Sequence, residues 1–234
     1  MVGVRRPKAA SLLVLSVVLL AGCGSERQVP GSPTAAAATG VELAGDPAAD
    51  AEAIRATFDR YRSELLAQNG GGVPALVSPS TIEHYDHVMH LARTAGPEEI
   101  AGTGLMDRVM IARLRVETPP EFASMDGGAL LAYGVDEGMI DASSVDGNSL
   151  GEIRVEGDRG YAEMLVDGEP SGVDWEFERV GPQWTFDLAA GFPLINDTLS
   201  QIAAESGMTD DEFVFDAVSM VTGQPVDASV YEKP

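Results

Sequence analysis

The chain has 234 residues, of which 15 are Lys or Arg and 37 are Asp or Glu, so its formal net charge is −22. Phosphate groups are bound by surfaces rich in Lys and Arg, and this balance argues against a nucleic-acid partner and against a polybasic membrane-binding patch. With 44% hydrophobic residues the chain has enough apolar side chains for a core. Its length fits one domain with extensions or two small domains.

The N-terminus predicts an export signal. Three bases between residues 5 and 8 precede an apolar run over 9–20, which is too short to span a bilayer but fits a secretory signal. The run ends in Leu20-Ala21-Gly22-Cys23, which resembles the lipobox of bacterial lipoproteins. The resemblance implies cleavage before Cys23, a diacylglycerol thioether on its sulfur and fatty acylation of the new amino group.

We therefore expect residues 1–22 to be a lipoprotein signal peptide and residues 23–45, which hold few large apolar side chains, to be a flexible tether. Cys23 is the only cysteine, so it has no disulfide partner within the chain. Two or more acyl chains anchor a protein stably. The expected location is the exported side of the cell membrane or the outer membrane. The alternative is an ordinary signal peptide with an incidental cysteine.

The first part of the folded region predicts helices. Asp46-Pro47 is a helix start, and Ile54, Phe58, Tyr61 and Leu65 follow at helical spacing until the glycine run at 70–72. A second helix is expected from Ser78-Pro79 to about residue 94, with Tyr85 on its apolar face. Two further helical pieces are expected around residues 106–114 and 126–137.

From about residue 150 the pattern changes to alternation, which predicts an antiparallel meander with strands near 152–155, 161–166, 173–180 and 183–188. After Pro193 the helical period returns as far as Gly207. Thr209 to Glu212 forms a capping box for a last helix that ends at Gly223. Helices followed by a run of strands indicate an α+β fold with helices packed on one face of the sheet.

Residues 151–162 (GEIRVEGDRGYA) and 175–187 (WEFERVGPQWTFD) resemble the closing strands of NTF2-like proteins. This resemblance implies an NTF2-like domain over about residues 46–190, in which N-terminal helices pack on a curved antiparallel sheet around a pocket. Residues 191–234 are then a C-terminal helical extension. Because this family includes isomerases, dehydratases and non-enzymatic binding modules, the fold alone assigns no activity.

An NTF2-like pocket would lie between the helices and the concave face of the sheet. Tyr61, Tyr85 and Asp187 are the polar candidates for it. None of them forms a catalytic dyad that spacing reveals, and no catalytic residue is assigned. The alternative is that Tyr61 and Tyr85 are core aromatics and that Asp187 is a turn or cap residue.

All three histidines lie within seven residues, at 84, 87 and 90. On a helix, Glu83, His87 and His90 lie opposite the apolar face, and Glu83 and His87 are an i,i+4 pair, so a weak metal site is geometrically possible. The alternative is a solvated helix face. Zinc sites take three or four ligands, and no matching His or Cys lies elsewhere in the sequence, so any further ligand would be Asp or Glu. We expect no metal or other cofactor.

These observations predict a lipid-anchored envelope protein that is not an enzyme and binds a small apolar ligand or another envelope protein. An NTF2-like isomerase or dehydratase acting on a small apolar substrate is the alternative. A third possibility is a scaffold that dimerises through an apolar face of its sheet.

Overall fold

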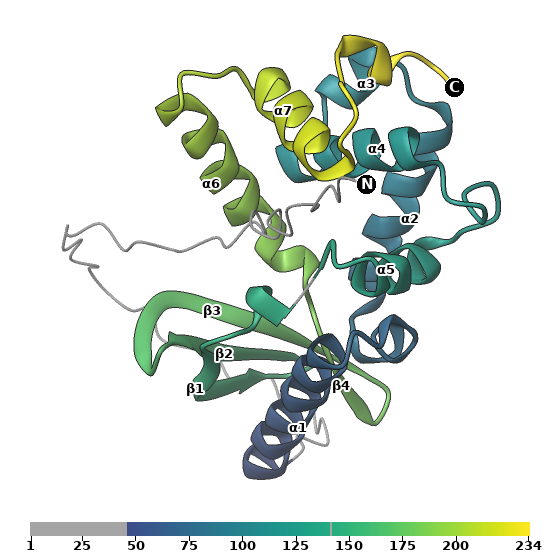
Figure 1. Ribbon diagram of the computed structural model, residues 1–234. Coiled ribbons are helices and arrows are strands. Elements are labelled where there is room, and N and C mark those ends of the chain that lie inside the picture. Colours follow the sequence, from purple (N-terminus) through teal and green to yellow (C-terminus); the bar gives the residue numbers. More distant parts are fainter. Residues whose placement is uncertain (1–45, 141) are drawn as a thin grey trace, which may run out of the picture.

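The computed structural model describes residues 46–140 and 142–234, so the expected signal peptide, tether and Cys23 lie outside the described residues. This part of the chain combines helices with one antiparallel sheet, which confirms the α+β class (Figure 1). The helices are α1 (Pro47–Leu66), α2 (Pro79–Thr94), α3 (Pro97–Ala101), α4 (Leu105–Glu117), α5 (Gly127–Asp136), α6 (Phe192–Glu205) and α7 (Asp210–Thr222). The strands are β1 (Asn148–Glu156), β2 (Arg159–Val166), β3 (Glu169–Val180) and β4 (Gln183–Phe186).

The chain folds into two packed parts. We call α1 with β1–β4 the sheet half, and α2–α7 the helical half. Figure 1 shows α1 lying along the sheet, while the other helices gather at the opposite end of the molecule. The expectation that the N-terminal helices as a group pack on the sheet therefore holds for α1, whereas α2, α4 and α5 pack mainly against other helices.

The sheet half is a meander with strand order β1-β2-β3-β4 and register irregularities in β1–β2 and β2–β3 pairing. Its inner face packs against the apolar stripe of α1, where Ile54, Phe58 and Leu65 are buried. Its outer face carries alternating charged side chains, including the ion pair between Arg154 and Asp174 (2.6 Å). The free edge of β4 is partly covered because the backbone N–H of Ser78 donates to the carbonyl of Phe186 (2.9 Å).

In the helical half, side chains cap the helix ends and the helices pack around α4. Ser78 accepts a hydrogen bond from the N–H of Thr81 and begins α2, and Thr209 and Glu212 form the predicted capping box of α7. α4 packs against α2, α6 and α7. Leu199, Val214 and Val218 are buried in the same apolar cluster as the core of α2 and α4. The expected C-terminal extension thus contributes to the core rather than standing apart from it.

The expected elements are found with shifted boundaries. β3 begins at Glu169 rather than near 173. The pairing of β2 with β3 shifts register between Glu163 and Leu165, and beyond the shift Leu165 and Val166 pair with Pro170 and Glu169. The helix α3 was not expected, since five residues are too few to show a helical period. Among the described residues, none of the helices combines the length and the apolar character needed to cross a membrane.

A glycine sets the contact between α2 and α5. A Cβ atom at Gly127 would lie 2.3 Å from the carbonyl oxygen of Ile82 and 2.6 Å from the backbone nitrogen of Asp86. The N–H of Gly127 also donates to the carboxylate of Asp86 (2.5 Å). The two backbones therefore approach more closely than any side chain at this position permits.

Replacing Gly127 with Ala is expected to lower the free energy of unfolding by about 1–3 kcal/mol or more, because α2 and α5 must separate to accommodate the methyl group. Gly128→Ala is the matched control, since a Cβ atom there meets nothing nearer than 3.6 Å. Urea unfolding of both variants measures the difference. Equal stability of the two variants would contradict the close approach of α2 and α5.

Candidate functional site

Aromatic side chains fill the space where an NTF2-like pocket was expected. Between α1 and the inner face of the sheet, the ring of Phe58 lies edge-on to Trp175 with 4.8 Å between centroids. Phe186 stacks on Trp175 (4.8 Å) and on Phe177 (5.0 Å). Ile54 lies close to Gly160, since a Cβ atom added at Gly160 would lie 2.5 Å from Cδ1 of Ile54. These residues pack against one another between α1 and the inner face of the sheet.

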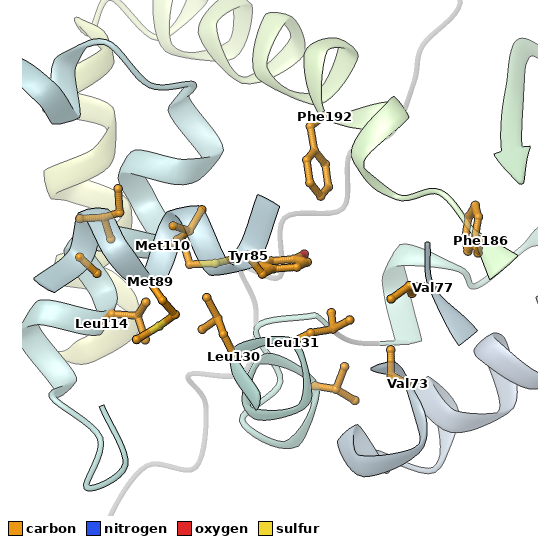
Figure 2. Close-up of a cluster of buried hydrophobic side chains, with 14 of the residues drawn as sticks. Val73, Val77, Tyr85, Met89, Met110, Leu114, Leu130, Leu131, Phe186 and Phe192 are labelled. Carbon is orange, nitrogen blue, oxygen red and sulfur yellow. The ribbon is translucent and has the colours of Figure 1, made fainter. Parts of the chain in front are cut away.

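Tyr61 and Tyr85 lie in this core. Tyr61 on α1 packs edge-on to Phe186 (5.2 Å), and Tyr85 on α2 packs against Phe192 (6.0 Å). Figure 2 shows Tyr85 within the buried apolar cluster, beside Leu131 and Phe192. Burial, and then a neighbouring charge or phenol, raises the pKa of each hydroxyl above its ordinary value. Both phenols therefore stay protonated at neutral pH, and neither serves as a general base there.

Asp187 lies elsewhere, at the junction of the two halves. It follows β4 directly, and its buried carboxylate accepts hydrogen bonds from Ser78 Oγ (3.0 Å), Ser80 Oγ (2.9 Å) and Arg159 Nη1 (2.8 Å). Ser78 and Ser80 stand at the start of α2, where the partial positive charge of the helix N-terminus favours an anion. The hydrogen bond to Asp187 in turn raises the pKa of Arg159. We call Asp187, Arg159, Ser78 and Ser80 the junction cluster.

The sequence shows Asp187 but not its partners. Asp187 is 28 positions from Arg159 and 109 from Ser78. The one sequence feature that bears on Arg159 as a partner is the alternation of β2, which places this residue on the polar face of the sheet. The junction cluster supplies the Asp187 carboxylate with three hydrogen-bond donors, an arrangement that stabilises the structure.

The three histidines of α2 do not share one environment, since His87 and His90 are exposed and His84 is half-buried. Glu83, His87 and His90 are exposed on α2, and His90 lies near Thr94 Oγ1 (3.4 Å). Within residues 46–140 and 142–234, no three His, Cys, Asp or Glu side chains are grouped so that they could hold a metal ion. His84 instead faces inward, with 2.9 Å between its Nε2 and Oδ1 of Asp107 and its ring 4.5 Å from that of Phe192.

Asp50 is a further buried acid, which the sequence analysis did not identify. Its carboxylate accepts hydrogen bonds from Arg179 Nη2 (2.5 Å) and Trp184 Nε1 (3.1 Å), and the Arg179 guanidinium lies over the Trp184 ring at 4.4 Å. The hydrogen bond from Arg179 lowers the pKa of Asp50. The available signal was its position four residues before Ile54, which places an acid on the apolar stripe of α1.

Two shallow grooves lie on the surface of the described part. One, of about 220 Å³, is walled by Ala53, Ala56 and Arg60 of α1 and by Leu76 and Trp184. The other, of about 320 Å³, lies beside Arg115 and the C-terminal residues. Tyr61, Tyr85 and Asp187 line neither groove.

Two cations, Arg115 and Lys233, line the second groove, and the hydrogen-bond donors of Arg115 are already occupied. Arg115 donates five hydrogen bonds to backbone carbonyls, those of Leu91, Ala92, Ala95, Val230 and Glu232. Three of these carbonyls belong to the end of α2, where the negative end of the helix dipole favours a cation. A guanidinium has five N–H donors, so Arg115 has none left for a ligand.

Comparison with protein-family models, with curated proteins and with solved structures finds no match.

Replacing Asp187 with Ala is expected to lower the free energy of unfolding by about 2–3 kcal/mol, because the hydroxyl donors and Arg159 lose their common acceptor. Asp174→Ala, which removes the exposed partner of Arg154, is the control and should cost less than about 1 kcal/mol. Urea unfolding at pH 7 compares the two. A loss no larger for Asp187→Ala than for Asp174→Ala would show that the junction cluster does not hold the halves together.

Asp50 predicts a pH dependence. Because its folded-state pKa lies below the ordinary value of 3.8, its contribution to stability is present above that pH and is lost as the pH falls through the folded-state pKa. Asp50→Asn should therefore lower the free energy of unfolding by about 1–3 kcal/mol at pH 7 and flatten its decline below pH 4.

The control is Asp158→Asn, which removes an exposed carboxylate 3.4 Å from the same Arg179. Unfolding titrations between pH 3 and pH 7 measure both variants. If Asp50→Asn and the unmodified chain lose stability in parallel on acidification, Asp50 is not the group that titrates.

Proposed function

We propose that this chain is an exported, lipid-anchored envelope protein whose folded domain is a non-catalytic binding module. The observation that carries the non-catalytic part of this proposal is that the buried acids are paired with basic side chains. The buried acids of the described part are Asp50, Asp107 and Asp187, and each has a basic partner: Arg179, His84 and Arg159. An isomerase or dehydratase needs an ionisable group that faces an open cavity, and none of these three acids lines the two grooves.

The sheet half is the part of the chain that we propose to be NTF2-like. What supports this is a helix, α1, laid along the inner face of a four-stranded antiparallel meander, and the hairpin from Trp175 to Asp187 that carries the sequence resemblance. In this proposal the aromatic side chains of Phe58, Trp175 and Phe186 occupy the volume that other members of the family keep open. The domain then retains the architecture without the pocket.

Another protein is a better partner for this domain than a small ligand. Sites for small molecules generally enclose about 300–1,000 Å³ and bury most of the ligand. The two shallow grooves, of about 220 and 320 Å³, are at or below the lower end of this range. The outer face of the sheet carries Arg154, Asp174 and Glu176, which does not suit dimerisation through an apolar sheet face.

The lipobox at Cys23 supports attachment to a membrane. Signal cleavage would leave 12 bases and 37 acids, a net charge of −25, on the mature chain. So acidic a domain is repelled by anionic headgroups, and the attachment therefore depends on the acyl chains at Cys23. In this proposal the domain faces the exported side of the cell membrane or the outer membrane.

Cys23→Ala is expected to abolish lipidation and release the protein from the membrane fraction, because it removes the thiol to which the diacylglycerol is attached. The folded domain begins at α1 and should keep its stability. Fractionation after a high-salt wash, with mass spectrometry of the N-terminal peptide, measures the outcome. Ser25→Ala is the control and should stay lipidated. Retention of Cys23→Ala in the washed membranes would overturn the anchor.

A further inference from the structure

Helix α6 uses one side to pack against the molecule. Phe192, Leu199 and Ala203 are buried on that side. Asn196, on the same side, accepts a hydrogen bond from the backbone N–H of Met106 (2.9 Å) through its Oδ1. Because the residue preceding α4 is Gly104, which has no side chain to cap the helix, Asn196 supplies the acceptor for its first turn. These contacts fix which side of α6 faces outward.

An apolar strip adjoins this buried side. At about 100° per residue, Ile195, Thr198 and Ile202 lie within about 60° of one another, and Leu194 lies next to them. Ile202 is 37% exposed and Leu194 is 38% exposed, while Ile195 and Thr198 are half-buried. We call these four residues the α6 stripe. Exposed apolar residues that line up along one helix mark an interaction surface more strongly than scattered ones.

The surroundings of the α6 stripe are acidic. Between Arg179 and Lys233 the sequence contains no Lys, Arg or His, and it contains nine acids. Two of them lie on α6 itself: Asp197 is three residues after Leu194, and Glu205 is three residues after Ile202. Both are exposed. Spacing of three residues places each acid beside the stripe residue before it.

We propose that the α6 stripe is the docking surface for a basic amphipathic helix of a partner protein. This inference rests on the proposed function and names the chemistry of the partner. The apolar side of such a helix covers Ile195 and Ile202, and its Lys or Arg residues meet Asp197 and Glu205. A second copy of this chain is a poorer occupant, because a two-fold contact on the stripe brings the same acids together. An anionic lipid surface is repelled for the same reason.

The test uses the purified full chain in nonionic detergent and two synthetic helical peptides of about 15 residues, one of Leu and Lys and the other of Leu and Glu. Hydrogen exchange of backbone amides locates binding, and fluorescence anisotropy measures affinity at low and at physiological salt. The Leu/Lys peptide should protect α6 and bind more weakly as salt is raised. The Leu/Glu peptide should not bind.

Two variants identify the surface. The double substitution Leu194→Ser and Ile202→Ser should weaken binding of the Leu/Lys peptide by about tenfold or more, because it removes the apolar anchors. Leu66→Ser is the matched control, since Leu66 is 57% exposed on α1 in the sheet half, and its affinity should be unchanged. Asp197→Asn with Glu205→Gln should weaken binding and reduce its salt dependence.

Three outcomes would overturn the inference. The first is equal binding of both peptides, and the second is equal affinity of the Leu194→Ser, Ile202→Ser variant and the unmodified chain. The third is sedimentation showing a dimer that this double variant abolishes, which would assign the stripe to self-association. The anchor is tested separately by Cys23→Ala, so failure of either proposal is recognised independently of the other.

Discussion

The buried carboxylate of Asp187 lies where the two halves of this molecule meet and bonds to both. Asp187 ends the sheet and accepts hydrogen bonds from Arg159 on β2 and from two serines at the start of α2. Thr81, one turn into the same helix, accepts from the N–H groups of Leu188 and Ala189. The chain segments before α2 and after β4 are thus tied to each other. Because the direction of a helix follows from how its first turn is held, these bonds orient the whole helical half relative to the sheet.

Side chains that bind backbone groups also help to position the remaining helices. Arg115 joins the end of α2 to the C-terminal residues, and Asn196 of α6 caps α4. Gly127 lets α5 approach the backbone of α2. Each of these contacts satisfies polar groups that a helix end leaves open. The outward side of α6 is consequently set by contacts on its opposite side, where Asn196 caps α4 and where Phe192, Leu199 and Ala203 are buried.

Local signals predicted the elements, and distant partners explain what the sequence did not reveal. Asp46, Ser78 and Thr209 accept hydrogen bonds within two or three residues, so their capping roles are readable in the sequence. Asp50 is held by Arg179, 129 positions away, and its position on the apolar stripe of α1 does not identify that partner. The helical stripes identified Tyr61 and Tyr85 as core or pocket residues without deciding between the two. That choice depended on Phe58, Trp175 and Phe186, whose combined volume becomes apparent only when α1 lies on the sheet.

Two groups of acids in the last 50 residues have different physical explanations. Asp210, Asp211 and Glu212 lie in the first turn of α7, where they complement the helix dipole. Asp211 also pairs with Arg108 (3.3 Å). Asp197 and Asp216 make no hydrogen bond or ion pair in the described part of the chain, and no base follows before Lys233. Uncompensated charge destabilises a compact state and supports solubility without specifying a fold. Folding therefore accounts for the three acids in the first turn of α7 better than for Asp216 or for Asp197, the acid beside the exposed side of α6.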